Sequence, residues 1–234
     1  MRLNPIAVYD YLTSIGITHL YHANTVKTSC TFLRTGGLLS RGAVEHFGLV
    51  QTPQSSDEID KRYNVWNDIF LDSVDLHGGR FPRQNLYGPV LFKIKLNVLR
   101  HPTLPELWVT KDNPTRWYDG QVDSERYMNG IEEFKTLYAN GSYKEMITIR
   151  NTYGFLPFDS YLEEIILDDP QLRIVSDGRV FFDEAAHALK DAMKSCSYNL
   201  DNVTRTRRIC NIGCYCRENY KGFLVQELSR LFFN

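Results

Sequence analysis

Hydrophobic positions near the N-terminus follow a helical period and then change to short apolar runs. Apolar residues at helical spacing follow Asn4-Pro5 and stop at Gly16, which predicts an amphipathic helix packed on the rest of the chain. Residues 18–23 predict a strand. Asn24 is the expected cap of a helix over residues 25–35 that ends at two glycines. The chain is therefore expected to begin with a helix, a strand and a second helix.

The rest of the chain predicts many strands with few helices between them. Residues 41–58 have no sustained period and many turn formers, so they predict a loop or cover, and 57–65 predicts a short helix. Strands are expected at 67–72, 90–96, 107–110, 146–149, 160–170 and 172–175, and longer helices at 124–139, 183–194 and 218–232. This order favours an α+β fold with mixed or antiparallel sheets and flanking helices. We expect one domain over residues 1–178 and a small helical, basic, cysteine-containing C-terminal extension over 179–234, packed on it.

The predicted strand at residues 160–170 carries two acids at its start. Glu163 and Glu164 precede an apolar run that Pro170 closes. Because side chains alternate along a strand, the two carboxylates should point to opposite faces, and at most one can face a shared cleft. A slip of one residue in the register would exchange their faces. Acids at strand ends are also common in proteins without any catalytic role.

Composition excludes some classes of protein and leaves others open. The 234 residues are 43% hydrophobic and 24% charged, which is typical of a globular protein that can bury a core. A net charge of −1 gives no attraction of the whole protein to nucleic acid or anionic lipid, so a polyanion site would have to be a local patch. The N-terminus does not resemble a secretory signal, and no apolar run is long enough to cross a bilayer. We expect a cytoplasmic protein without a membrane partner.

The C-terminal segment combines positive charge with thiols. Residues 194–221 contain six basic residues against two acids, and this segment includes Arg207 and Arg208, which we expect to contact phosphate backbone. Four of the five cysteines also lie in the last forty residues: Cys196, Cys210, Cys214 and Cys216. Their spacing fits no common zinc pattern, so buried free thiols are expected, and a zinc site is the minor alternative.

Four short motifs, taken in order, resemble the DarT-like family of ADP-ribosyltransferase toxins, which use NAD to modify nucleic acid. The first is Leu-Tyr-His-Ala-Asn at 20–24, followed by a helix and Gly-Leu-Leu at 37–39. The second is Ile-Asp-Lys-Arg at 59–62, with a shorter spacer to the next strand than the family has. The third is the strand at 66–72, with fewer aromatic residues than in the family. The fourth is Glu-Ile-Ile-Leu at 164–167.

The resemblance implies NAD as a substrate and assigns roles to matching residues. It places His22 on the nicotinamide ribose and makes Glu164 the catalytic carboxylate, while the choice between Arg62 and Lys61 for the functional cation stays open. The residues expected to line the NAD pocket are Tyr21, His22, Asn24, Gly37 and Leu38. Cleavage of the nicotinamide bond builds positive charge on the ribose, which a fixed carboxylate stabilises.

The same resemblance assigns the turn-rich loop before Glu164 to the acceptor. Four residues of this loop are expected to stack on unpaired bases: Arg150, Tyr153, Phe155 and Phe158. The alternative is that these side chains belong to the core. The implied function is transfer of ADP-ribose to a nucleobase of DNA or RNA, with single strands favoured, in a toxin or phage-defence effector. A partner would be an antitoxin such as an ADP-ribosyl-removing macrodomain. The alternatives are a protein-modifying enzyme of the same fold and a non-catalytic nucleic-acid-binding module.

Overall fold

The structure is a computed structural model that describes residues 2–77, 87–104, 106–142, 144–150, 152–196 and 198–234. Its helices are α1 (Pro5–Ser14), α2 (Val26–Thr35), α3 (Arg41–His46), α4 (Asp57–Arg62), α5 (Asp123–Arg126), α6 (Ile131–Leu137), α7 (Phe181–Lys194), α8 (Tyr215–Gly222) and α9 (Val225–Phe232). Its strands are β1 (His19–Asn24), β2 (Gly37–Leu39), β3 (Ile69–Leu71), β4 (Val90–Lys95), β5 (Trp108–Val109), β6 (Ile147–Ile149), β7 (Phe155–Pro157), β8 (Leu162–Asp169) and β9 (Thr204–Ile209). Short 3₁₀ turns lie at Leu96–Arg100 and Pro114–Arg116.

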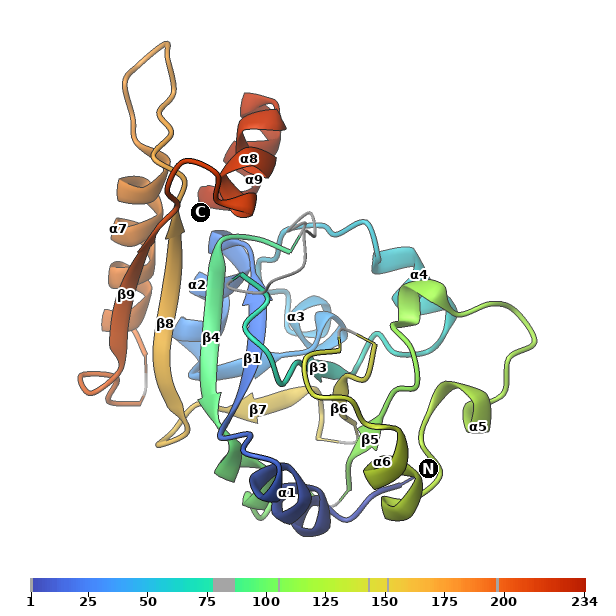
Figure 1. The fold of residues 1–234 in the computed structure, drawn as a ribbon. Coiled ribbons are helices and arrows are strands. Elements are labelled where there is room, and N and C mark those ends of the chain that lie inside the picture. Colours follow the sequence, from blue (N-terminus) through green and yellow to red (C-terminus); the bar gives the residue numbers. More distant parts are fainter. Residues whose placement is uncertain (1, 78–86, 105, 143, 151, 197) are drawn as a thin grey trace.

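A central sheet with the strand order β1-β4-β8-β9 organises the molecule. The pairs β1/β4 and β4/β8 are antiparallel, whereas β9 runs parallel to β8. Two smaller sheets have the orders β3-β6-β5 and β2-β7. Figure 1 shows α2 and α7 on one face of the central sheet and the β3-β6-β5 sheet beyond its edge strand β1, where Tyr21 forms a bridge with Asp72. The predicted α+β class with mixed and antiparallel sheets is confirmed.

Helix α2 forms where the sequence predicts it, but a different residue caps it. Thr25 is the N-cap, and its hydroxyl accepts a hydrogen bond from the backbone N–H of Thr28. Asn24, which was the expected cap, is the last residue of β1, and its side chain accepts from the N–H of Thr25 at 2.9 Å. The helix ends at Gly36, whose φ of 77° is left-handed, as glycine allows at low cost. Because α2 begins directly after β1, the side chains at this end of β1 lie beside its first turn.

Tertiary contacts override local periodicity at several predicted elements. The helix predicted at 124–139 is divided into α5 and α6, because Tyr127 is extended, pairs with Thr110 and packs on Trp108 and Trp117. The loop predicted at 41–58 contains α3, and the helix predicted at 218–232 is divided into α8 and α9. At the strand predicted over 172–175, the structure has only an isolated β-bridge between Arg173 and Val180.

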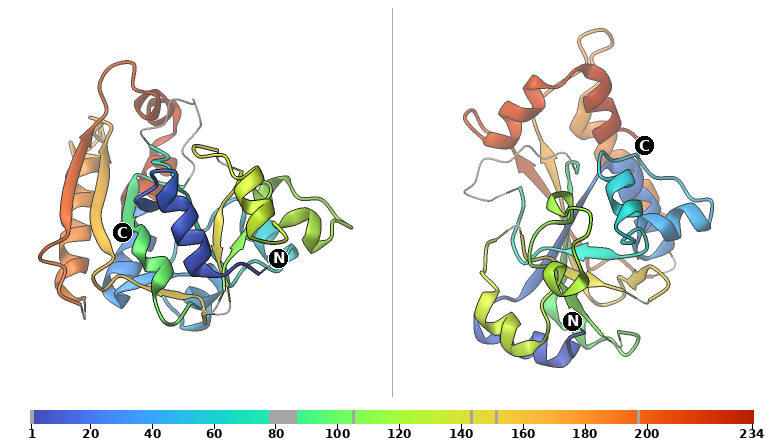
Figure 2. Two further views of the ribbon diagram at one scale, coloured as in Figure 1. Left: turned by 60° about the horizontal axis from the view of Figure 1, so that its bottom comes forward. Right: turned by 90° about the vertical axis from the view of Figure 1, so that its right-hand side faces the viewer.

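The C-terminal residues contribute strand β9 to the central sheet, and the sequence did not predict this strand. Strand β9 is polar and lies beside β8, and α7 packs on α2 and β8. Figure 2 shows α7 alongside these two strands, with α8 and α9 near their far ends. Side chains from α7, α8 and α9 belong to the same buried core as those of α1, α2 and the central sheet. In the described part of the chain, no helix is long and apolar enough to span a membrane.

Candidate active site

A cavity lies at the end of β1, between α2, α3 and β3. It encloses about 900 Å³ of space between atoms, part of it open to solvent, and polar side chains from several elements line it. Those that matter for chemistry are His22 and Asn24 from β1, Arg41 from α3, Asp60 from α4, and Asp68 from the turn before β3.

His22 presents one ring nitrogen as a hydrogen-bond acceptor. Its Nδ1 lies 2.9 Å from the carbonyl oxygen of Phe70, and because a carbonyl only accepts, Nδ1 carries the proton. Burial lowers the pKa of the ring, so it is neutral at physiological pH. Its Nε2 therefore accepts, and the side-chain nitrogen of Asn24 lies 3.4 Å from it. This His–Asn pair can receive a ligand hydroxyl at the end of β1.

Arg41 contributes a partly buried cation to the same cavity. One terminal nitrogen donates to the Asp57 carboxylate at 2.7 Å and to the carbonyl of Thr52 at 3.0 Å, and the guanidinium lies 5.4 Å from the centre of the Trp66 ring. The Nε atom of Arg41 is buried and has no hydrogen-bond partner among the described residues. A buried unpaired donor of this kind is costly unless a ligand satisfies it, and an anionic oxygen would do so.

Sequence reasoning missed Arg41 because it assigned the stretch after residue 40 to a loop. Ser40 in fact caps α3, since its hydroxyl accepts from the N–H of Ala43 at 3.1 Å. A serine directly after the Gly-Leu-Leu motif was the available signal for a helix start. That cap directs the first helical residue, Arg41, into the cavity wall.

The two cations that the sequence proposed lie outside the cavity's described lining. Arg62 is 60% exposed and forms an ion pair with Asp119. Lys61 lies 4.6 Å from the centre of the Trp66 ring and 3.9 Å from a carboxylate oxygen of Glu45. The structure therefore brings neither of them together with His22.

Glu164 shares a face of the central sheet with Tyr21, not with His22. Across the sheet, Tyr21, Lys93 and Glu164 occupy paired positions, and His22 pairs with the next position along β4. Because neighbouring residues on a strand point to opposite faces, Glu164 and His22 approach from opposite sides of the sheet. Glu164 accepts hydrogen bonds from the hydroxyl of Thr206 and, at 3.4 Å, from Nζ of Lys93.

A β-bulge brings Glu163 to the same lysine. The register of β4 and β8 shifts between Lys93 and Ile94, so Glu163 is an extra residue in β8. Nζ of Lys93 lies 2.8 Å from the Glu163 carboxylate, which also contacts Nε2 of His19 at 3.0 Å. The hydrogen bonds from Lys93 and His19 lower the pKa of Glu163 to about 2. The expectation that the two acids point to opposite faces is wrong, because the bulge interrupts the alternation on which it depended.

A small apolar cluster connects the cavity with the face that carries Glu164. Ala23 and Leu76 line the cavity, and both pack with Ile166 in this cluster. Ile166 is two residues beyond Glu164 on β8 and points to the same face, a separation of about 7 Å along the strand. A ligand longer than the cavity could therefore extend along this wall toward Glu164.

The remaining expected pocket residues surround the cavity less directly. Tyr21 is paired through its backbone with Asp72, and burial raises the pKa of its hydroxyl. Gly37 and Leu38 are buried in β2, where a Cβ on Gly37 would meet the carbonyl oxygen of Leu156 at 2.5 Å. Their structural effect is to bring the following residues, from Leu39 to Arg41, to the cavity wall.

The expected acceptor residues divide into buried and exposed ones. Phe158 is 1% exposed and stacks on Phe92, and the partly buried Phe155 packs against the same core, as the core alternative proposed. Arg150 is held between the Asp68 carboxylate, at 3.0 Å, and the ring of Trp108. Tyr153, by contrast, is 97% exposed.

A second groove lies between α3 and the turn that carries Tyr153. Its lining includes Phe47, Asn64, Asn67 and Tyr153, and its floor includes Asp68, which also lines the cavity. Burial raises the pKa of Asp68 to about 7, although the Arg150 guanidinium opposes the shift. Asp68 is thus a carboxyl shared by two adjoining openings.

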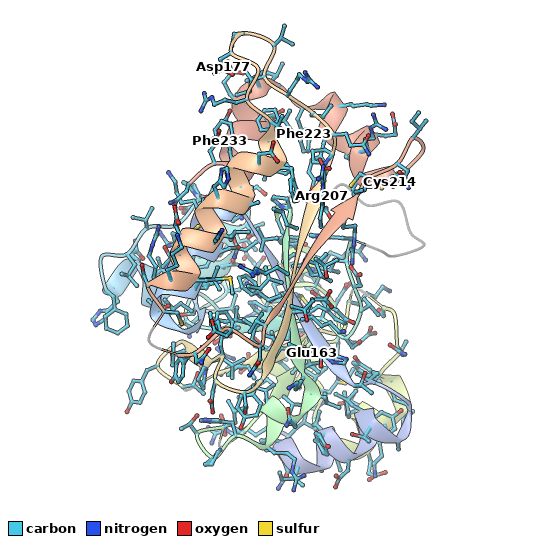
Figure 3. All side chains as sticks on the ribbon, turned by 90° about the vertical axis from the view of Figure 1, so that its left-hand side faces the viewer. Glu163, Asp177, Arg207, Cys214, Phe223 and Phe233 are labelled. Carbon is cyan, nitrogen blue, oxygen red and sulfur yellow. The ribbon has the colours of Figure 1, made fainter. Side chains whose placement is uncertain are left out.

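The basic residues of the C-terminal segment are paired with acids. Two nitrogens of Arg207 contact one oxygen of Asp169, and Arg208 forms a two-pronged pair with Asp75. Figure 3 shows Arg207 toward the C-terminal helices and Glu163 toward the other end of the sheet. The positive charge of these two arginines is therefore largely neutralised within the protein.

The C-terminal cysteines are free thiols. Cys210 and Cys216 are buried, and burial raises the pKa of both, to about 12 for Cys216. Cys196 and Cys214 are partly exposed. Within the described residues, no group of three or more His, Cys, Asp or Glu side chains is arranged to hold a metal ion.

Comparison of the fold with solved structures finds DarT of Thermus sp. 2.9. Its complex with NAD⁺ has 14% sequence identity and a TM-score of 0.48, over 81% of this chain and 96% of that one. Its complex with ADP-ribosylated single-stranded DNA has 15% identity and a TM-score of 0.48, over 83% of this chain and 93% of that one. No family model and no curated protein matches the sequence.

Proposed function

We propose that this protein is an NAD-dependent ADP-ribosyltransferase that modifies a nucleobase of single-stranded nucleic acid. The observation that carries the proposal is the cavity at the end of β1, which combines the acceptor nitrogen of His22 with the unpaired donor of Arg41. A dinucleotide offers both complements, since it has ribose hydroxyls that donate and a pyrophosphate that accepts.

Each cavity residue has a role in this proposal. Nε2 of His22 accepts a hydrogen bond from a ribose hydroxyl, with the Asn24 amide beside it. Arg41 binds the pyrophosphate through its guanidinium, whose Nε is buried, in the role that the resemblance gave to Arg62 or Lys61. The nicotinamide ribose extends along the wall of Ala23 toward Glu164. NAD is a substrate here, and cleavage of its glycosidic bond releases nicotinamide.

Glu164 supplies the negative charge that this bond cleavage requires. The transition state carries positive charge on the ribose, as in glycoside hydrolysis, and a fixed carboxylate stabilises it. In the proposed enzyme, Glu164 lies over the open face of the sheet, where Thr206 and Lys93 hold it. Asp68 is the second candidate carboxyl, because it lines the cavity and its pKa is raised to about 7.

The acceptor side of the proposal depends on Tyr153. Its exposed ring can stack on a base that is not paired, and stacking of this kind is tolerant of sequence. Arg150 positions the turn through Asp68 instead of contacting the base. Arg207 and Arg208 are already paired with acids, so a binding module that acts through these two residues alone has less support.

The decisive experiment is incubation of the purified protein with NAD and with single- and double-stranded DNA and RNA oligonucleotides. The expected result is a gain of one ADP-ribose mass on a single-stranded oligonucleotide, absent with Glu164→Gln. Label from NAD that appears on polypeptide alone would support the protein-modifying alternative. No product with any acceptor would refute the proposal.

A role as a toxin follows from the same proposal and has its own test. Expression of the wild type should arrest growth, and expression of Glu164→Gln at equal level should not. An ADP-ribosyl-removing macrodomain, acting as antitoxin, should restore growth. Equal growth with both proteins would refute the toxin role without affecting the biochemical one.

A further inference from the structure

The carboxylate of Glu164 is held by donors from the two strands on either side of β8. Its Oε1 accepts a hydrogen bond from the hydroxyl of Thr206 on β9, and its Oε2 lies 3.4 Å from Nζ of Lys93 on β4. With one donor on each oxygen, rotation of the carboxylate would break at least one contact. The donors on the neighbouring strands β4 and β9 therefore fix the orientation of the Glu164 carboxylate plane.

The register of β9 determines which residue can reach Glu164. Strand β9 runs parallel to β8, with Thr204 opposite Glu164 and Thr206 opposite Ile166. Residues two apart on a strand share a face, so Thr206 and Glu164 lie on the same side of the sheet. Threonine is branched at Cβ and stiff at χ1, which directs its hydroxyl to one place.

Lys93 contacts both Glu163 and Glu164, whereas the hydrogen bond described for the Thr206 hydroxyl goes to Glu164 alone. The ammonium of Lys93 lies 2.8 Å from Glu163 and 3.4 Å from Glu164, so its closer partner is the bulged acid. Glu163 is held in addition by His19. The hydrogen bond from the Thr206 hydroxyl is thus the contact that belongs to Glu164.

We propose that Thr206 is a positioning residue of the ADP-ribosyltransferase, which holds the Glu164 carboxylate oriented toward the ribose. This inference rests on the proposed function. It assigns a catalytic contribution to the C-terminal residues 179–234, in which the sequence suggested only phosphate contacts. Removal of the hydroxyl frees the carboxylate to rotate, which lowers the rate of the chemical step and leaves NAD binding at the cavity intact.

The test compares Thr206→Val, which keeps the shape and removes the hydroxyl, with Thr206→Ser, which restores a hydroxyl. Thr204→Val is the matched control on the same strand and face. We expect Thr206→Val to lower kcat about 10- to 100-fold, as misplaced catalytic groups do, with the KM for NAD changed less than about threefold. Thr206→Ser should recover most of kcat, and Thr204→Val should keep it. All three variants should unfold at the wild-type temperature.

The outcomes separate the inference from the proposed function. An active wild type whose Thr206→Val variant keeps kcat would overturn the role of Thr206 alone. Full activity of Glu164→Gln would overturn it as well, with ADP-ribosyl transfer still standing. A wild type that is inactive with every acceptor would overturn both.

Discussion

At the scale of single residues, the cavity beside β1 contains one buried donor without a partner among the described residues and one weakly held acceptor. In the His22 ring, Nδ1 donates to a backbone carbonyl, and Nε2 accepts from the Asn24 amide over a long distance of 3.4 Å. The Arg41 guanidinium has two partners for one terminal nitrogen and none for Nε among the described residues. Buried groups are usually satisfied, so the Arg41 Nε atom indicates a polar ligand, and the long contact at His22 leaves room for a ligand hydroxyl.

The Arg41 assignment predicts a loss of NAD affinity on substitution. Arg41→Lys keeps the charge and removes Nε, so we expect NAD binding to weaken about tenfold, the effect of one hydrogen bond to a charged group. Isothermal titration calorimetry measures this directly. Arg62→Lys is the matched control at an exposed position, and it should bind NAD as the wild type does. Equal affinities for the two variants would refute the assignment.

The lowered pKa of Glu163 predicts that the free energy of unfolding depends on pH in the acid range. Its pKa is lowered to about 2 in the folded protein, below the unfolded value of about 4.3, so its ionised form favours folding. That stabilisation is complete above the unfolded pKa and disappears as the pH falls from about 4 through about 2. Because the side chain is 36% exposed, solvent screening limits it to below about 1 kcal/mol.

The measurement is the free energy of unfolding in urea between pH 2 and 6 for the wild type and Glu163→Gln. The variant should be less stable than the wild type near pH 6, and the difference should shrink toward pH 2. Glu132→Gln is the control, and its effect at pH 6 should be smaller, because the Glu132 side chain is 82% exposed and solvent screens its contact with Lys135. A difference that is constant with pH would contradict the ion-pair account.

At the scale of elements, close packing between α3 and the turn before β7 shapes the groove that Tyr153 lines. Gly42 on α3 faces the side chain of Asn67, and Gly154 in the turn faces Ser40. A Cβ on Gly154 would lie 2.1 Å from Oγ of Ser40 and 2.9 Å from Cβ of Ala43. The turn and the helix therefore approach more closely than any larger residue would allow.

This packing predicts different costs for the same substitution at two glycines. Gly154 and Gly178 both have left-handed φ angles, of 68° and 75°, so alanine costs about 1 kcal/mol at either from the backbone. Only Gly154→Ala also meets neighbouring atoms, which adds about 1–3 kcal/mol. Chemical denaturation of both variants measures the difference. Equal losses of stability would show that the turn can move away from α3 at no cost.

At the scale of the whole molecule, the C-terminal residues complete the sheet and core of the preceding ones. Strand β9 covers the edge of β8, and α7 packs on α2. A buried polar network joins the two parts, because Asp168 on β8 contacts Nδ1 of His77 at 3.2 Å and accepts from the hydroxyl of Tyr220 on α8 at 3.1 Å. Removal of one partner would leave a buried carboxylate insufficiently paired.

Truncation tests whether residues 1–178 form an independent domain. We expect a protein that ends at residue 178 to lose cooperative unfolding, because it exposes the edge of β8 and the apolar side of α2. Circular dichroism and thermal denaturation measure this, with the full chain as the reference. A truncated protein with a sharp unfolding transition would show that the two parts fold separately.

The amino-acid sequence by itself determined the elements whose stability is local. Residues 5–14 and 26–35 are helices because their spacing and end signals are encoded in neighbouring residues. The apolar run before Pro170 forms β8, and His22 lies on β1, as predicted. The α+β class followed from the order of such elements, and it is confirmed.

Only the tertiary structure decided the features that depend on partners distant in sequence. Strand β9 is polar and became a strand by pairing with β8, and the bulge that brings Glu163 to Lys93 arises from the register of two separate strands. Arg41 entered the cavity because Ser40 caps a helix in a stretch without a clear period. Pairing, register and burial arise only when the whole chain is folded, and they determine which polar groups stay available for chemistry.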